Sequence, residues 1–392
     1  MGKYNFDEII DRRNTSCLKY DFGIARKGRD DLLPLWVADM DFRLPESIIE
    51  GLQQRVAHGI FGYTDSNEDY KNAVRGWYKK RHGYDISDEW LTVVPGMVYS
   101  IALAIKAFTE PGDSVIIQQP VYYPFMETIK ENGRKVVNSQ LVYADGHYEI
   151  DFEDFEKKIV DEKVKLFLLC SPHNPVGKVW KKEELTRLAE ICKRHDVYVF
   201  ADEIHCDFVY SGYKHTSFMT LGEEYLDKLV LGVAPTKTFN IAGLQITNIV
   251  IANAEVRLAF KRENNKAGYS QPNVLGLHAA YLAYSKGEEW LDEVREYLQG
   301  NLDFVRSFLK EKIPKVHLIE PQGTYLVWLD FSEVCDNHKD LEKLIVDGAK
   351  LWLDPGIIFG RETALFERIN IASPRKIIEQ ALVQLYDAIN SH

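Results

Sequence analysis

The sequence predicts an α/β protein with a large domain on a mostly parallel central sheet and a smaller α+β domain beside it. Between residues 91 and 252, short β-branched runs alternate with helix-length amphipathic stretches, the pattern of β-α crossovers. A chain of 392 residues suits a large domain with a smaller companion. We expect a large domain at 45–285 and a small domain formed by 1–44 and 286–392, with a shared cleft between them.

Six short apolar runs are the candidate strands of the large domain. They lie at residues 91–94, 114–118, 165–170, 197–201, 228–233 and 246–251. Helices are expected at 97–108 and at 182–195, where apolar residues recur at spacings of three and four. Ligands of open α/β sheets gather outside the carboxyl ends of the strands, so functional side chains are expected there.

The chain after residue 273 has a different pattern. A long charged stretch at 288–312 predicts a helix, and 317–330 and 367–372 are strand-like. We assign this region, together with the N-terminal segment, to the small domain.

Composition excludes several classes of partner. Forty-eight Lys and Arg residues against 59 Asp and Glu residues give a net charge of −11, which repels nucleic acids and anionic lipids. The opening residues 1–13 lack the apolar core of a signal peptide, and no apolar run approaches the roughly 18–20 residues of a membrane helix. Five scattered cysteines do not form a disulfide pattern. We therefore expect a cytoplasmic protein with no nucleic-acid or membrane partner.

Two charged residues stand where expected strands end. Lys237 follows the run that ends at Val233, so its side chain is expected to point into the cleft. Asp202 ends another strand, where a buried carboxylate is unfavourable unless a cation pairs with it. A protonated pyridine nitrogen is such a cation, and keeping it protonated makes the ring an electron sink. A solvated surface lysine and a helix-capping aspartate are the alternatives.

Two further features suit the same ring. Asn174 lies in a rigid Asn-Pro turn after a third strand, where its amide can donate to a phenolic ring oxygen. The helix expected at 97–108 follows Gly96 and begins with free backbone N–H groups, which favour an anion such as a phosphate.

An aromatic residue and an arginine complete the candidate site. Tyr122 follows a fourth strand and can lie flat on a ring, although ordinary packing is the alternative. Arg368 lies in an otherwise apolar strand and needs an anionic partner. A substrate carboxylate held in bidentate fashion would serve, and a structural ion pair is the alternative.

In this order, the residues resemble the fold-type I pyridoxal-phosphate enzymes over nearly the whole chain. Shorter strings resemble one branch, the MalY/PatB family of cystathionine β-lyases, or C–S lyases. These strings are DRR at 11–13, LKYD at 18–21, LWVADMDF at 35–42, SPHNP at 171–175, DEIH at 202–205 and TKTFNIAGL at 236–244. The resemblance implies pyridoxal 5′-phosphate as the cofactor, held by Lys237 as a Schiff base.

The resemblance also implies a role for each site residue. It implies Lys237, Asp202 and Tyr122 as catalytic residues, with Asp202 at the pyridine nitrogen and Tyr122 stacked on the ring. The implied cofactor contacts are Lys237, Asp202, Asn174, Tyr122, Gly96, Met97, Val98, Thr236, His205 and Tyr63. The implied substrate contacts are Arg368, Ala38 and Tyr63. Tyr63 is expected to reach across from a second subunit, so the resemblance implies a homodimer.

Two departures from related aminotransferases concern the ring and the phosphate, and a third departure from the family's usual pattern concerns the turn before the carboxylate-binding Arg368. His205 stands where many of them carry a tyrosine, and Gln245 stands where they often carry an arginine. The turn at 360–366 is poorer in glycine than usual. We expect phosphate binding to depend more on backbone N–H groups and on Thr236. The neighbouring Cys170, Asp202, His205 and Cys206 lack zinc-ligand spacing, so no metal is expected.

The resemblance implies a carbon–sulfur β-lyase that cleaves a small sulfur-containing amino acid, such as cystathionine or cysteine, to a thiol, pyruvate and ammonia. Lys237 is expected to remove the α-proton. An aminotransferase uses the same lysine and is the main alternative. A regulatory protein that keeps the fold is a third possibility, and the intact set of Lys237, Asp202, Asn174 and Arg368 argues against it.

Overall fold

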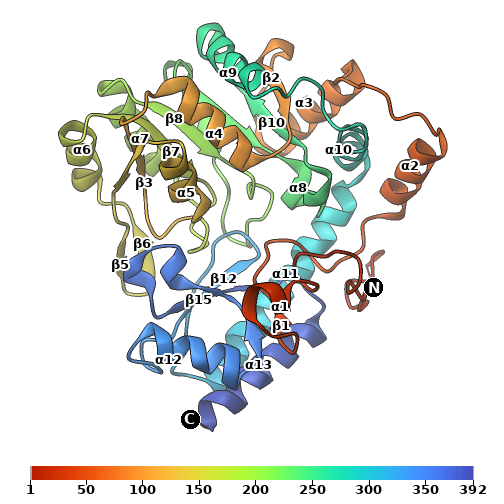
Figure 1. Ribbon diagram of the computed structural model, residues 1–392, viewed down its shortest axis with the longest axis vertical. Helices are drawn as coiled ribbons and strands as arrows, with labels where there is room; N and C mark the ends of the chain where they lie inside the picture. Colours follow the sequence, from red (N-terminus) through yellow and green to blue (C-terminus); the bar gives the residue numbers. More distant parts are fainter. Residues whose placement is uncertain (1, 392) are drawn as a thin grey trace.

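The computed structural model describes residues 2–391. Two sheets organise them, a seven-stranded sheet in the middle of the chain and a four-stranded sheet near its C-terminus (Figure 1). No helix within residues 2–391 is long and apolar enough to cross a membrane.

The seven-stranded sheet has the order β2-β10-β9-β8-β7-β3-β4. Its strands are β2 (Leu91–Val94), β3 (Ser114–Ile117), β4 (Lys135–Asn138), β7 (Val164–Cys170), β8 (Tyr198–Asp202), β9 (Leu229–Val233) and β10 (Thr247–Val250). The pairs from β4 to β9 are parallel, whereas β10 is antiparallel to both β9 and β2. The carboxyl ends of β2, β7, β8 and β9 therefore share one edge. The expected α/β fold with a mostly parallel sheet is confirmed.

Helices cover both faces of this sheet (Figure 1). They include α4 (Met97–Phe108), α5 (Pro124–Glu131), α6 (Phe152–Asp161), α7 (Lys182–Arg194) and α9 (Ala254–Lys266). Side chains of one strand alternate between the two faces. Leu166 and Leu168 of β7 pack in the core below α4, whereas Phe167 and Leu169 pack in the core that holds α7. The large part is thus a three-layer structure.

Three further helices flank the large part. They are α2 (Glu46–Ala57), α3 (Glu68–His82) and α10 (Val274–Lys286), and α10 contacts both of the others. A small antiparallel pair, β5 (Val142–Ala144) with β6 (His147–Glu149), and the short helix α8 (Pro235–Thr238) complete this part.

The small part is an antiparallel sheet with helices. Its strands are β11 (His317–Ile319), β12 (Leu326–Asp330), β14 (Asp354–Pro355) and β15 (Phe366–Asn370), and its helices are α11 (Glu288–Lys312), α12 (His338–Glu342) and α13 (Arg375–Asn390). The N-terminal segment contains α1 (Gly23–Lys27), and its strand β1 (Leu33–Pro34) pairs with β13 (Leu351–Trp352). This pairing ties the N-terminal segment to the C-terminal part. The domain limits 45–285 remain a prediction.

Candidate active site

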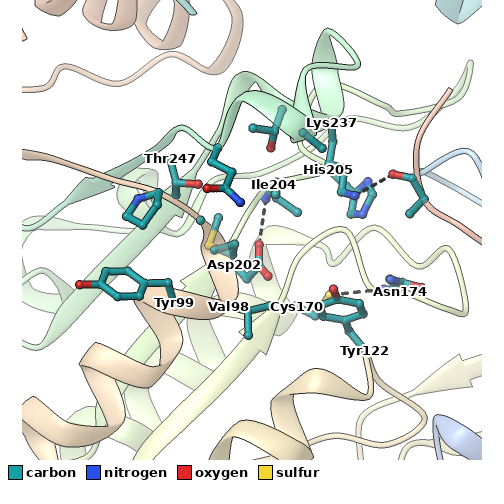
Figure 2. A pocket seen from close by; sticks show the side chains of 17 residues that line it. Val98, Tyr99, Tyr122, Cys170, Asn174, Asp202, Ile204, His205, Lys237 and Thr247 are labelled. Atoms are coloured by element: carbon teal, nitrogen blue, oxygen red, sulfur yellow. Dashed lines mark hydrogen bonds between the residues drawn. The ribbon is translucent and has the colours of Figure 1, made fainter. Parts of the chain in front are cut away.

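A cavity of about 260 Å³ opens at the carboxyl edge of the seven-stranded sheet (Figure 2). Its lining contains many of the predicted site residues: Ala38, Gly96, Met97, Val98, Tyr122, Asn174, Asp202, His205, Thr236 and Lys237. All of them except Ala38 lie at or after the carboxyl ends of β2, β3, β7, β8 and β9, so the sheet brings them together. Lining residues that the sequence did not single out include Tyr99, Ile204 and Thr247.

Lys237 lies in α8, directly after β9, and helix formation is favoured there by Pro235 at the first turn. Its Nζ donates a hydrogen bond to the Ala38 carbonyl at 2.6 Å. Burial lowers the pKa of Lys237 to about 8, and the charges of Asp39 and Asp202 oppose that shift. An amine with this pKa is partly unprotonated near neutral pH and can act as a base.

Asp202 is the last residue of β8 and only 3% exposed. Its Oδ1 accepts a hydrogen bond from the Ile204 N–H at 3.1 Å. Burial raises the pKa of Asp202 to about 7, although this hydrogen bond and the charge of Lys237 lower it. A cation placed against this carboxylate would reverse the shift. The site therefore favours a ligand that places a positive charge against Asp202.

His205 lies in the same cavity as a neutral imidazole. Burial, together with the nearby charges of Lys237 and Arg368, lowers the pKa of His205 to about 3. Its ring packs edge-on against Tyr325, with 5.7 Å between ring centroids. Its Nδ1 is buried without a hydrogen-bond partner among residues 2–391. His205 thus retains a polar atom that a ligand can satisfy.

The N-terminus of α4 forms the opposite wall of the cavity. No side chain of the described residues caps this helix, so its first backbone N–H groups remain available. A Cβ built on Gly96 would meet no atom of residues 2–391 within 4 Å. Thr236 and Gln245 line the same cavity. Free N–H groups at a helix N-terminus are a favourable seat for a phosphate.

Arg368 lies in β15 behind the cavity and contacts its lining through Asn174. Its Nη1 donates to Asn174 Oδ1 at 3.0 Å, and its Nη2 donates to the Trp36 carbonyl at 2.9 Å. Nη2 also pairs with the carboxylate of Asp354. The structural ion pair that the sequence left open is therefore present. Asp354 was not predicted, because an acid in a two-residue strand gives no periodic signal.

Tyr63 does not line this cavity within its own chain. It follows α2 and is 95% exposed, beside the exposed side chains of Ile60 and Phe61. Its predicted reach into a second subunit remains a prediction.

A loop at residues 36–41, which we call the strap, covers the cavity beside Lys237. The carbonyl of Ala38 accepts from Tyr325 Oη at 3.0 Å as well as from Lys237. Asn370 Nδ2 donates to the carbonyls of Val37 and Asp39, each at 2.6 Å. The strap is thus bound by side chains from both parts of the molecule.

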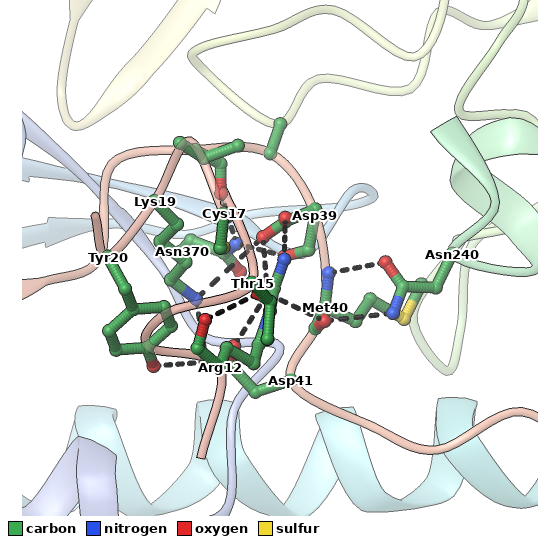
Figure 3. Close-up of polar contacts among 12 residues, drawn as sticks. Arg12, Thr15, Cys17, Lys19, Tyr20, Asp39, Met40, Asp41, Asn240 and Asn370 are labelled. Atoms are coloured by element: carbon green, nitrogen blue, oxygen red, sulfur yellow. Dashed lines mark hydrogen bonds and ion pairs between the residues drawn. The ribbon is translucent and has the colours of Figure 1, made fainter. Parts of the chain in front are cut away.

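Two cations from the N-terminal segment hold the acidic residues of the strap (Figure 3). Arg12 pairs with Asp39 at 2.6 Å and with Asp41 at 2.8 Å. Lys19 pairs with Asp41 at 2.6 Å. Burial opposes the ionisation of Asp41, but Lys19 and Arg12 keep the pKa of this carboxyl below its usual value. One network of ion pairs therefore connects the sequence strings at 11–13, 18–21 and 35–42.

One group of potential metal ligands occurs in the described part of the chain. His82, Cys206 and Asp207 have ligating atoms within 4.8 Å of one another. Asp207 already accepts hydrogen bonds from Trp77 and from Thr238. None of the three ligands lines the cavity beside Lys237.

Comparisons with known proteins agree with this geometry. The family model of the class I and II aminotransferases matches residues 30–385. The chain is 42% identical to cystathionine β-lyase PatB of Bacillus subtilis over 98% of this chain and 100% of the relative. It is 34% identical to protein MalY of Escherichia coli over 99% of each chain.

A solved structure adds the cofactor to this comparison. Cystalysin from Treponema denticola superposes with a TM-score of 0.96 and 38% identity, over 99% of each chain. That crystal structure contains pyridoxal 5′-phosphate.

Proposed function

We infer the function of this chain from the family to which it belongs, the MalY/PatB family within the class I and II aminotransferases. The chain is a pyridoxal-phosphate-dependent carbon–sulfur β-lyase, and its substrate is a sulfur-containing amino acid. One observation carries this conclusion in the structure. Lys237, with its lowered pKa, and the buried acid Asp202 face the same cavity opposite an uncapped helix N-terminus.

The residues of the cavity fit pyridoxal phosphate. The raised pKa of Asp202 marks a carboxylate without a full counter-charge, and a protonated ring nitrogen supplies that charge. Asn174 accepts from Arg368 through Oδ1, which leaves its Nδ2 to donate to the ring oxygen. Tyr122 would stack on the ring, and His205 would offer its unpartnered Nδ1 for a hydrogen bond. The N–H groups of Met97 and Val98, following Gly96, and the Thr236 hydroxyl would hold the phosphate.

When bound, the cofactor draws electrons from the α-carbon of the amino acid. The protein's own contribution is to move protons and to orient the substrate. We propose that Nζ of Lys237 removes the α-proton once substrate has freed the lysine, because a pKa of about 8 leaves part of the amine unprotonated. The Ala38 carbonyl, 2.6 Å from Nζ, would keep the amine in the cavity.

The leaving sulfur requires a proton of its own. Lys237, which has just accepted one, is the first candidate donor. Tyr122 is the second, because burial raises the pKa of its phenol and keeps it protonated. Loss of the thiol and addition of water then give pyruvate and ammonia.

Substrate orientation would fall to Arg368, whose guanidinium suits an α-carboxylate. Ala38 and Tyr63 would complete the substrate contacts. Tyr63 would come from a second copy of the chain, and its exposure next to Ile60 and Phe61 supports an apolar contact between subunits. We therefore propose a homodimer with shared active sites.

The proposed function is tested with L-cystathionine in the absence of any keto acid. A lyase releases pyruvate and thiol over many turnovers, both of which can be followed by colorimetric or coupled assays. An aminotransferase instead stops after one turnover, with the cofactor in its amine form. That outcome would overturn the lyase assignment.

Lys237→Ala should lose both the visible absorbance of the lysine-bound cofactor and the activity. Lys182→Ala is the matched control, because Lys182 is exposed at the start of α7 and remote from the cavity lining. The control should keep both signals. A Lys237→Ala variant that still turned over would contradict the assignment of Lys237.

A further inference from the structure

Asp354 forms an ion pair with Arg368, the residue proposed to bind the substrate carboxylate. We propose that its carboxylate occupies Arg368 in the free enzyme and is displaced by the α-carboxylate of the substrate. Asp354 would then be a positioning residue that sets how tightly the enzyme binds its substrate. This inference rests on the proposed function, because it takes Arg368 as the anchor of the substrate carboxylate.

The register of the small sheet places the two residues together. Asp354 of β14 pairs directly with Arg368 of β15 across the antiparallel ladder. Directly opposed residues point to the same face of a sheet, with their Cβ atoms about 4.5–5.5 Å apart. Asp354 is 5% exposed and Arg368 is 3% exposed. Their ion pair is therefore shielded from water. In such a buried site, the carboxylate of Asp354 competes strongly with a substrate carboxylate for Arg368.

The hydrogen bonds of Arg368 occupy Nη1 and Nη2, whereas its buried Nε has no partner among residues 2–391. A guanidinium binds a carboxylate in bidentate fashion through two parallel N–H bonds. The two donors are either Nη1 and Nη2 or Nε and Nη2, so both arrangements use Nη2. Here Nη2 donates to both Asp354 and the Trp36 carbonyl, and Nη1 donates to Asn174. A bidentate grip on substrate therefore requires Nη2 to release a partner.

Asp354 is the partner that can leave. The Trp36 carbonyl belongs to the strap, whose next four residues are all bonded to other parts of the protein. The carboxylate of Asp354, by contrast, belongs to a side chain and not to the backbone. Its negative charge is the one that an incoming carboxylate can replace. An arginine buried without any anion is strongly unfavourable, which explains why a resident carboxylate holds it in the free enzyme.

The charges around Asp354 are consistent with its displacement. Burial raises the pKa of Asp354, while the charges of Arg368 and Lys27 oppose this shift. The carboxyl of Glu367, next to Arg368 in the paired strand β15, is also buried, and the charge of Asp354 helps to raise its pKa. Tyr123 faces the pair as well. Once Arg368 turns to the substrate, Asp354 can remain buried as a neutral acid.

The test compares Asp354→Asn with the wild-type holoenzyme. We expect KM for L-cystathionine and the inhibition constant of propionate to fall about 3- to 10-fold, because a charge-assisted competitor is lost. The value of kcat should change less than about twofold, since Asp354 takes no part in proton transfer. Asp330→Asn is the matched control, a buried carboxylate in β12 of the same sheet that contacts Ser332 and Tyr143. It should leave KM unchanged.

A rival role for Asp354 predicts the opposite sign. If the carboxylate merely holds Arg368 in its productive position, Asp354→Asn raises KM and weakens propionate binding. Either that result or unchanged values of both constants would overturn the proposal. Where the asparagine variant does not fold, Asp354→Ser gives the same comparison.

A second measurement separates this proposal from the proposed function. Propionate binding to the cofactor-free chain, followed as a shift in unfolding temperature, needs no catalysis. Tighter binding by the Asp354→Asn variant supports the displacement even if the wild-type protein shows no lyase activity. Absence of lyase activity would contradict the proposed function alone.

Discussion

At the scale of single residues, the cavity holds two ionisable groups whose pKa values move toward each other. Burial raises the pKa of Asp202 to about 7 and lowers that of Lys237 to about 8. Each charged form is unfavourable in the cofactor-free protein, because neither has a full counter-charge at hydrogen-bond distance. A cofactor that brings a ring cation to Asp202 and takes up the amine of Lys237 relieves both. The site is thus unfavourable when empty and favourable when filled.

The raised pKa of Asp202 predicts how the stability of the cofactor-free protein depends on pH. The folded pKa of Asp202, about 7, lies above the unfolded value of 3.8. Between these values the folded chain keeps a proton that the unfolded chain has released, so stability falls as pH rises through this window and stays lower above it. Asp202→Asn removes the titration. We expect the variant to gain stability relative to wild type between pH 4 and pH 8, by up to about 4 kcal/mol.

Denaturant unfolding of both cofactor-free proteins across this pH range measures the effect. Asp330→Asn, which removes a buried acid of the small sheet, serves as the control. Parallel stability curves for wild type and Asp202→Asn would show that the carboxyl of Asp202 is not strained in the empty site.

The site residues were predictable where they lie at the carboxyl ends of the parallel strands. Asp202 ends β8, and Asn174 and Lys237 follow the neighbouring parallel strands β7 and β9, so a sequence pattern that marks the strand ends also marks the site. Asp354 and Thr247 lacked such a signal. Asp354 reaches Arg368 through a cross-strand register, and Thr247 begins an antiparallel strand, so its amino end lies where the other strands have their carboxyl ends.

At the scale of elements, the strap is a loop that regular secondary structure does not support. Its position depends on buried ion pairs, with Lys19 fully buried against Asp41. The strings that form this network were visible in the sequence, but their contact was not. Arg12 and Lys19 lie more than 20 residues before the aspartates they bind, and no periodicity links them.

Removing one member of this network is expected to affect both stability and activity. Lys19→Met leaves the carboxylate of Asp41 buried with less counter-charge, which should lower the free energy of unfolding by about 3 kcal/mol. The activity should fall with it, because the displaced strap no longer holds the Ala38 carbonyl against Lys237. Denaturant unfolding and kcat/KM provide the two measurements.

Two comparisons make this prediction specific. Lys350→Met removes a half-exposed lysine that pairs with Asp31 at 3.2 Å, and it should alter stability by less than about 1 kcal/mol. Adding Asp41→Asn to Lys19→Met should recover part of the lost stability, because the unpaired charge disappears. A double variant as unstable as the sum of the two single variants would argue against a coupled network.

At the scale of the whole molecule, the alternation of strands and helices predicted the large sheet well. The six expected strands all occur, with ends shifted by at most one residue. The direction of β10 was not predictable, since the composition of a short strand does not show whether it runs parallel or antiparallel to its neighbours. The edge strand β4 was missed because it is short and partly exposed. In the small part, the expected strand at 317–330 divides into β11 and β12.

The exposed segment that carries Tyr63 is the feature that a single chain does not explain. Ile60, Phe61 and Tyr63 are each more than half exposed, which is unfavourable for so many large apolar side chains in sequence. If this segment completes the active site of a second copy, each site of the dimer combines Lys237 of one chain with Tyr63 of the other. Symmetric homodimers commonly share sites in this way, because one twofold axis creates both contacts.

Subunit complementation tests this arrangement. Lys237→Ala and Tyr63→Ala homodimers should each be nearly inactive. After equal mixing with subunit exchange, half of the dimers are mixed, and each mixed dimer pairs one intact Lys237 with the intact Tyr63 of its partner chain. About one quarter of all sites are then complete, so we expect about one quarter of the wild-type activity to return.

The control mixes Lys237→Ala with Asp202→Asn. Both residues serve the same cavity of the same chain, so every site of a mixed dimer lacks one of them and no activity should return. If Tyr63 instead acted within its own chain, the Lys237→Ala and Tyr63→Ala mixture would behave like this control. Recovery in the first mixture alone therefore requires a site shared between two chains, and it also explains why Tyr63 lies outside the cavity of its own chain.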